Sequence, residues 1–521
     1  MVRASVRQAA PLGERRALSV KTWSRYALYL AVIVTLVGAA LFVAPRLFVL
    51  FDEAYNLNLS KTIAQDGIYA SHLADGYRLF DPAVSTGPAL TVPLAMAMRL
   101  GGANLTTVRA AMLVVFLVSL ATALFSARQY VSALPALLFL ILFASTSLVL
   151  VFGLSVLGDV PAIALALGGL GLLRRAERDG RRRTLLLLLA GVALGLSILS
   201  KDIVVLLLPA LALAWLAGRP RRPSDLVPVV VAVCVAAGWR ALQWLYMHGI
   251  ASPDALARWN TQSAEMARQQ WAAVTFQPLS HLASAWRYSL DYFGPLLLSL
   301  ALAVAAFAAA RRLLHLPLVW IDWRSYGERS VVAGFLFWLA WYYLLSGPQA
   351  LHRHLLPGIV LGELIVVLLL QRLAEAAKGA SVASQRGARL LSAVLAVLLV
   401  WAVLHGAGFT RLYLRSSEQR LALQTAAAVW VQANVPEDGV LSGWGWYVPW
   451  HIAFLSDRLP AWVSLETPDL RGLSDWFVLS PEIGWGGGMD QRLQDFLARQ
   501  GTPAFDQRLY PLYRVTWRPP G

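Results

Sequence analysis

Eleven apolar runs, separated by short polar turns, constrain this chain more than any other feature of its sequence. Each run approaches the ~20 residues that a helix needs to cross a bilayer. We therefore expect an α-helical polytopic membrane protein with about eleven spans, in a range of about ten to thirteen. The runs cover residues 26–45, 106–127, 134–153, 160–174, 184–199, 203–217, 226–247, 289–310, 330–345, 355–371 and 389–409.

The composition agrees with a membrane protein and argues against a nucleic-acid-binding one. Only 14% of the residues are charged and the mean hydropathy is +0.58, whereas soluble domains carry roughly 25% charged residues. The net charge of +16 comes from Lys and Arg that stand in short clusters between apolar runs. Such clusters are typical of cytoplasmic loops that face anionic lipid. The single cysteine, Cys234, excludes an intrachain disulfide.

The basic loops predict the orientation in the plasma (inner) membrane. The clusters at 174–183, 219–222, 311–324 and 372–389 all fall on the cytoplasmic side if the basic N-terminus, residues 1–25, is also cytoplasmic. This requires the short, proline-containing segment Thr86–Gly101 to be an interfacial helix in the first outside loop and not a span.

The last apolar run ends near Phe409, and a small soluble α/β domain is expected after it. We therefore divide the chain into a cytoplasmic tail (1–25), a membrane-embedded domain (26–409) and an extracytoplasmic domain (410–521). Its tryptophans have two explanations, membrane-interface anchors or a surface on which carbohydrate stacks; they are Trp444, Trp446, Trp450 and Trp485.

Polar residues at the outside turns are the candidate functional residues. A charge at the edge of the hydrocarbon is costly unless it faces water, protein or a polar substrate. The set comprises Asp52 and Glu53 after the first run, Asp159, Lys201, and Arg353 with His354. Structural explanations compete: a solvated acidic turn for Asp52 and Glu53, a helix cap for Asp159, and a snorkelling lysine for Lys201.

The order and spacing of these residues resemble the C-type (GT-C) integral-membrane glycosyltransferases, in particular the branch of protein O-mannosyltransferases and lipid A aminoarabinose transferases. The resemblance covers roughly residues 20–410. It rests on the segments Phe51–Tyr55, Asp66–Gly67, Leu157–Pro161, Leu199–Lys201 and Arg353–Pro357. Val84–Pro88 lacks the charged residue or histidine that relatives often have there, and His354 replaces a tyrosine. Metal dependence and sugar identity therefore stay open.

The resemblance implies transfer of a sugar from a polyprenyl-phosphate donor to a hydroxyl acceptor on the outer face of the membrane. The acceptor is a lipid, a glycan or a protein. Asp52 is the expected general base, and Glu53 is the second candidate for this role. Asp159 would orient the acceptor or help to hold a divalent ion. Lys201, Arg353 and His354 would bind the donor phosphate.

Two other functions remain open from the sequence. A lipid or sugar transporter would use the charges for substrate binding, although such proteins usually show internal repeats, and we see none. A polysaccharide ligase or polymerase would depend on arginine and histidine in a large outside loop. The loop 247–288, with Arg258, Arg268, His281 and Arg287, keeps that alternative open.

Overall fold

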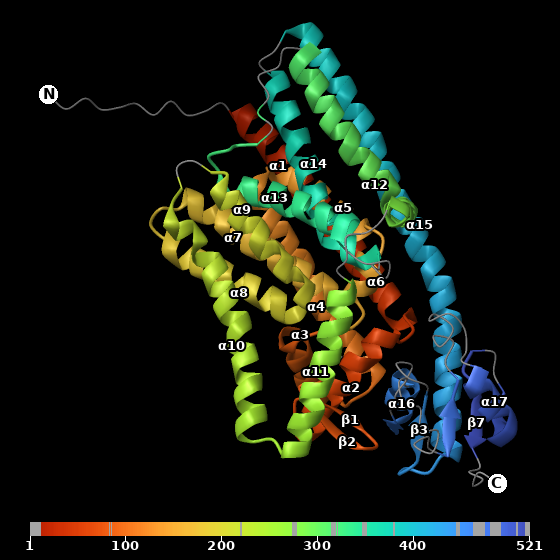
Figure 1. The fold of residues 1–521 in the computed structure, drawn as a ribbon. Helices are drawn as coiled ribbons and strands as arrows, with labels where there is room; N and C mark the ends of the chain where they lie inside the picture. Colours follow the sequence, from red (N-terminus) through yellow and green to blue (C-terminus); the bar gives the residue numbers. More distant parts are fainter. Residues whose placement is uncertain are drawn as a thin grey trace.

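A helix occupies each of the predicted apolar runs (Figure 1). The computed structural model describes all residues except 1–11, 83, 85, 219–220, 274–278, 314–318, 320, 346–351, 379–380, 444–448, 462–474, 480–490, 507–508 and 516–521. The helices are α1 (Leu12–Val43), α4 (Leu105–Tyr130), α5 (Ala133–Ser145) with α6 (Val149–Gly153), α7 (Asp159–Arg178), α8 (Arg183–Ser200), α9 (Leu207–Leu216), α10 (Val227–Gly249), α12 (Leu279–Leu313), α13 (Tyr326–Ala340), α14 (Leu356–Lys378) and α15 (Val382–Asn434).

Seven helices in the described part of the chain are long and apolar enough to cross a membrane. They include α1, α4, α8, α10, α12, α14 and α15. The remaining apolar runs form helices that are shorter, interrupted or charged at one end. For example, the run 134–153 is broken between α5 and α6, and α7 ends in several arginines. The structure confirms the predicted class, an α-helical polytopic membrane protein with a small α/β unit.

The first loop contains two short helices and a hairpin. These are α2 (Phe51–Asp66), the antiparallel strands β1 (Ala70–Leu73) and β2 (Gly76–Leu79), and α3 (Pro88–Gly101). With its 14 residues, α3 is about 21 Å long, which is shorter than the ~30 Å hydrocarbon core. Its length agrees with the predicted interfacial helix. The hairpin was not predicted. The other long loop forms α11 (Pro253–Ala273).

The C-terminal part folds around a five-stranded sheet in the order β4-β3-β5-β7-β6. β3 is parallel to β4 and β5, whereas β7 is antiparallel to β5 and β6. The sheet elements and helices are β3 (Val440–Ser442), α16 (Trp450–Ser456), β4 (Leu459–Ala461), β5 (Trp476–Val478), α17 (Gln491–Gln500), β6 (Gly501–Phe505) and β7 (Leu512–Val515). α15 runs without a break through the predicted boundary at 409–410, so the membrane part and the C-terminal part share one helix.

Trp450 is fully buried and packs against Tyr55 of α2, with ring centroids 4.8 Å apart. It is a core residue and neither a membrane anchor nor an exposed surface for carbohydrate. Trp444, Trp446 and Trp485 lie outside the described residues.

A buried ion pair between Glu53 and Arg109 joins the start of α2 to α4. The Nη1 atom of Arg109 lies 2.5 Å from Oε1 of Glu53, and Nη2 lies 3.3 Å from Oε2. The backbone N–H groups of Leu50 and Val156 also donate to this carboxylate, at 3.2 and 2.9 Å. Neither charged residue is exposed by more than 5%. The pair therefore fixes where α2 begins relative to the bundle.

Other charged residues separate to the two ends of the bundle. α7 has Asp159 at its first position and Arg178 at its last, and its 20 residues span about 30 Å. At the Arg178 end, Arg174 and Arg372 pair with Glu328 of α13 at 3.1 and 2.5 Å. This end contains residues of the basic loops that the sequence placed inside.

We expect Arg109→Leu to destabilise the protein by about 3–5 kcal/mol, because it leaves the Glu53 carboxylate buried without its cation. The measurement is the denaturation midpoint of the purified protein in detergent. Arg99→Leu, at the exposed end of α3, is the matched control. A midpoint equal to that of the control would show that the pair does not hold α2.

Candidate functional site

Segments far apart in the sequence meet at the end of the bundle where α7 begins. Asn56 of α2 donates a hydrogen bond to the Thr86 hydroxyl at 3.0 Å and another to the carbonyl of Val156. The Thr86 hydroxyl donates to the carbonyl of Leu157 at 2.9 Å, and the Thr86 backbone bridges to Lys201. These contacts bring α2, the start of α3, the start of α7 and the end of α8 to one place.

Gly158 allows the closest of these approaches. Its φ of +79° is in the left-handed region, which favours glycine. A Cβ atom here would lie 2.6 Å from the carbonyl oxygen of Ser200 and 3.0 Å from Cγ2 of Thr86. A larger residue would clash with the Ser200 backbone and crowd the Thr86 side chain.

Asp52 and Arg353 form an ion pair at this end of the bundle, with Nη2 2.5 Å from Oδ2. Asp52 lies in the first turn of α2, and Arg353 lies in the short 3-10 turn His352–Leu355 that leads into α14. The Asp52 side chain is 43% exposed, whereas that of Arg353 is 14% exposed. The carboxylate is therefore partly exposed, whereas the guanidinium is enclosed.

The neighbouring cations favour the ionised form of Asp52. Removal of water by the surrounding protein raises the pKa of this carboxyl. The charges of Arg353 and Lys201, with the hydrogen bond from Arg353 and a smaller effect of His354, outweigh it and hold the pKa below its ordinary value. Asp52 is thus a carboxylate at neutral pH.

Asp159 is buried at the first position of α7 and does not occupy the cap position. The N-cap residue is Gly158, which has no side chain to cap with. One carboxylate oxygen of Asp159 has no hydrogen-bond partner among the described residues. Its charge interacts with that of Arg353 and lies at the positive end of the α7 dipole.

Lys201 and His354 complete the group. Lys201 is only 4% exposed, which excludes the snorkelling lysine considered from the sequence, because a snorkelling side chain would reach solvent. His354 is held through its backbone carbonyl, which accepts a hydrogen bond from Nε1 of Trp338 at 2.6 Å. We call Asp52, Asp159, Lys201, Arg353 and His354 the charge cluster.

Glu53 is separate from the charge cluster although it follows Asp52 in the chain. Successive side chains on a helix point about 100° apart, and Glu53 points inward to Arg109. It has no exposed surface. Glu53 is therefore placed to hold α2 and not to contact a substrate.

The charge cluster combines two carboxylates with cations supplied by the protein. Within the described ranges, no three His, Cys, Asp or Glu side chains gather into a group that could hold a metal ion. Arg353 interacts electrostatically with both Asp52 and Asp159. The arrangement can accept a proton at Asp52 and bind an anionic group at Arg353 and Lys201.

Sequence reasoning missed the residues that hold the cluster together. Arg109 had a signal, since a lone arginine inside an apolar run is a candidate for a buried partner. Asn56 also had one, because it lies four residues after Asp52 and therefore on the same face of α2. Thr86 had none, because its role depends on the approach of α7.

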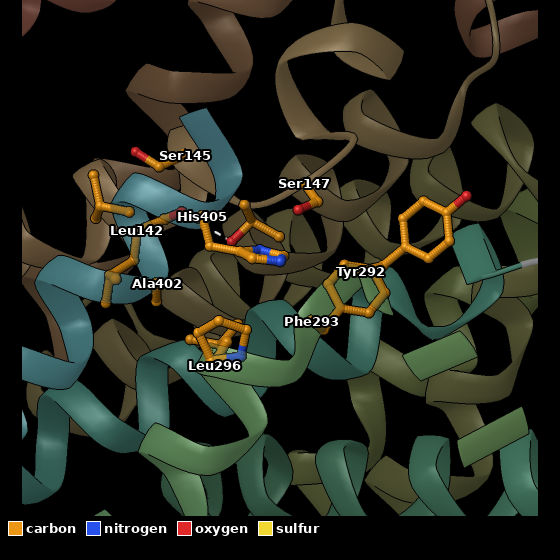
Figure 2. A pocket seen from close by; sticks show the side chains of 11 residues that line it. Leu142, Ser145, Ser147, Tyr292, Phe293, Leu296, Ala402 and His405 are labelled. Atoms are coloured by element: carbon orange, nitrogen blue, oxygen red, sulfur yellow. Dashed lines mark hydrogen bonds between the residues drawn. The ribbon is translucent and has the colours of Figure 1, made fainter. Parts of the chain in front are cut away.

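Two cavities in the described part of the chain are poor alternatives as a site for the chemistry. Figure 2 shows one that is lined by Ser145, Ser147, Tyr292 and His405, among others. Its volume of about 20 Å³ accommodates a water molecule and is too small for a sugar. A larger cavity of about 340 Å³ between α12, α13 and α14 is lined almost entirely by apolar side chains.

Known proteins share the fold of this chain. ArnT from Cupriavidus metallidurans bound to undecaprenyl phosphate aligns with a TM-score of 0.64 over 94% of this chain and 98% of that chain, at 14% identity. The archaeal oligosaccharyltransferase AglB from Archaeoglobus fulgidus, in complex with an inhibitory peptide and a dolichol-phosphate, aligns with a TM-score of 0.55 at 12% identity. That alignment covers 88% of this chain and 70% of AglB.

Sequence comparison gives a match over part of the chain. Residues 85–242 match the family model of the dolichyl-phosphate-mannose-protein mannosyltransferases. This region includes Thr86, Arg109, Asp159 and Lys201 and ends well before Arg353. No curated protein sequence matches the chain significantly. Residues 85–242 therefore resemble this mannosyltransferase family, and the chain as a whole has the fold of ArnT and AglB.

Proposed function

We propose that the protein transfers a sugar from a polyprenyl-phosphate donor to a hydroxyl-bearing acceptor, a lipid, a glycan or a protein, with Asp52 as the general base. The observation that carries this proposal is the charge cluster, in which a solvent-accessible carboxylate lies against an enclosed guanidinium. Two solved proteins of the same fold, described as bound to undecaprenyl phosphate and in complex with a dolichol-phosphate, support the choice of donor.

In this proposal the acceptor oxygen attacks the anomeric carbon while its proton passes to Asp52. The bond between the anomeric carbon and the phosphate oxygen breaks, and its electron pair leaves with the lipid phosphate. The sugar becomes oxocarbenium-like in the transition state, as in glycoside hydrolysis. Arg353 and Lys201 stabilise the charge that grows on the phosphate, most effectively where water is scarce. Asp159 orients the acceptor, and His354 adds to the positive field.

Binding of the donor would also change the partner of Arg353. In the structure the guanidinium binds Asp52, and a phosphate would compete for the same N–H groups. Once Arg353 turns to the phosphate, Asp52 loses its strongest cationic partner and its pKa rises. A carboxylate with a higher pKa is a better proton acceptor. The donor would thus activate the base that acts on the acceptor.

The proposed location is the plasma (inner) membrane, with the charge cluster and the C-terminal part extracytoplasmic and the N-terminus cytoplasmic. The separation of basic loop residues to the opposite end of the bundle supports this orientation, because such residues are enriched on the cytoplasmic side.

Asp52→Asn is expected to preserve folding and to lower the transfer rate on the order of 10²–10⁴-fold, because the amide cannot accept the acceptor proton. The measurement is turnover of purified protein reconstituted with polyprenyl-phosphate sugars and candidate acceptors. Asp66→Asn, at the other end of α2, is the matched control. Unchanged turnover in Asp52→Asn would remove this residue from the mechanism.

Lys201→Ala is expected to weaken donor binding roughly tenfold or more, because a buried cation facing the phosphate is lost. Titration of the reconstituted protein with donor lipid measures the affinity. Lys378→Ala, at the far end of α14, controls for the loss of one positive charge. If donor affinity stays at the wild-type value, Lys201 does not contact the phosphate.

The pH dependence of transfer tests the charge on Asp52. In the donor-free protein its pKa is held below the ordinary value, so the base form persists, and kcat/KM should fall only at pH values below the ordinary pKa of an aspartate. Arg353→Gln removes the main cation and leaves desolvation, which raises the pKa, so the acidic limb of the profile should move to higher pH. An acidic limb at the same pH in wild type and variant would contradict the pairing.

A further inference from the structure

We infer that the C-terminal part of the chain positions the catalytic helix α2, by holding the backbone on both sides of Asp52. Gln424 of α15 and Trp450 of α16 are the positioning residues. The inference deepens the proposed function, since it rests on Asp52 as the reacting group. It assigns to the C-terminal part a role in the reaction itself.

Gln424 holds the backbone that precedes α2. Its Oε1 accepts a hydrogen bond from the N–H of Val49 at 3.0 Å, and its Nε2 donates to the Val49 carbonyl at 2.9 Å. The side-chain amide thus pairs with both backbone groups of Val49 as a neighbouring strand would. Nε2 also lies 3.2 Å from the hydroxyl of Tyr510 in the C-terminal unit. Gln424 is completely buried, so no water replaces these bonds when they are lost.

Ser417, two turns earlier on α15, also makes hydrogen bonds to the backbone that precedes α2. Its hydroxyl accepts from the N–H of Phe48 at 2.8 Å and donates to the carbonyl of Arg46 at 2.8 Å. Like Gln424, Ser417 has no exposed surface. The segment between α1 and α2 is therefore bound to the side of α15 through its backbone.

Trp450 holds α2 on the other side of Asp52. It packs against Tyr55, which lies three residues after Asp52 and so close to the same helix face. Further contacts extend along this side: Lys61 of α2 pairs with Asp457, and the N–H of Ala74 donates to the carbonyl of Pro460 at 3.0 Å. Figure 1 shows α16 beside α2 and the β1–β2 hairpin.

The position of α2 matters because the charge cluster is assembled from separate elements. Asp52 is on α2, whereas its partner Arg353 precedes α14. A shift of α2 by about 1 Å would lengthen the Asp52–Arg353 contact and misplace the base, and such displacements can cost on the order of 10²-fold in rate. Removing the amide of Gln424 frees the Val49 backbone and permits this shift.

The test is Gln424→Met, which keeps length and volume but cannot pair with Val49. We expect kcat to fall roughly 10- to 100-fold while the KM for donor changes less than about threefold, because the phosphate-binding side chains stay in place. The acidic limb of the kcat/KM profile, which reports the donor-free protein, should also move to higher pH, since Asp52 moves away from the cations that face it, Arg353, Lys201 and His354. Burial lowers the pKa of His451 to about 3, so this side chain is neutral at the higher pH to which the limb of the variant moves.

The matched control is Gln432→Met, on the same helix. Gln432 also donates to a carbonyl of the C-terminal part, that of Leu455 at 3.3 Å, but this bond does not reach the segment before α2. The control should keep wild-type kcat and pH profile. Ser417→Ala, which removes the contact with Phe48, is the second variant should Gln424→Met unfold. A normal kcat and pH profile in whichever of these two variants folds would overturn the inference.

Hydrogen exchange separates this inference from the proposed function. The amides of Phe48 and Val49 should exchange on the order of tenfold faster in the Ser417→Ala and Gln424→Met variants, respectively, and not in Gln432→Met. This readout does not depend on turnover. If wild type transfers no sugar, or Asp52→Asn transfers it at the wild-type rate, the proposed function fails. Exchange still reports whether Ser417 and Gln424 hold the backbone before α2. Unchanged exchange would show that α15 does not hold this backbone segment, whatever the activity.

Discussion

The free-energy cost of removing charges from water is the constraint on which this fold depends. Glu53 and Arg109 are both removed from solvent, which is tolerated only because each charge has a partner and further hydrogen bonds. Glu53 also accepts from the N–H groups of Leu50 and Val156, so one carboxylate connects α2, α4 and the segment before α7. The preceding residue, Asp52, can then project from α2 toward Arg353. Glu53 thus points inward and stabilises the fold, whereas Asp52 points outward and is available for the proposed reaction.

The charge cluster shows how a membrane protein can keep a reactive carboxylate ionised. Burial alone would favour the neutral acid, which cannot act as a base. The nearby cations reverse this preference, and the same cations are suited to an anionic leaving group. The positive charge of Arg353 and Lys201 therefore has two successive uses in the proposed reaction, first to hold Asp52 in its ionised form and then to bind the phosphate.

Much of the helical architecture was predictable from the sequence because hydrophobic length is a strong signal in a bilayer. A small α/β unit after the last apolar run was also expected, and strands and helices form there. The joint placement of Asp52 and Arg353 at one end of the bundle followed from alternating helix direction and from the resemblance. The distinct partners of Asp52 and Glu53 did not follow, because adjacent carboxylates look equivalent until the helix places them about 100° apart. The contacts of Asn56, Thr86 and Gln424 depend on the approach of remote backbone, which no local pattern records.

α15 is a single rod of 53 residues that begins among the membrane helices and ends at Asn434, shortly before β3 of the C-terminal sheet. A rigid rod transmits rotation as well as distance. Each residue added within it would turn everything beyond the insertion by about 100°, and would carry Gln424 away from Val49 while the membrane half stayed in register. Insertions near seven, eleven or eighteen residues restore the angular phase, but each added residue also moves Gln424 about 1.5 Å further along the axis. The Gln424–Val49 contact therefore fixes the length of the helix between the membrane part and Gln424 in both rotation and distance, unlike the length of an ordinary interdomain linker.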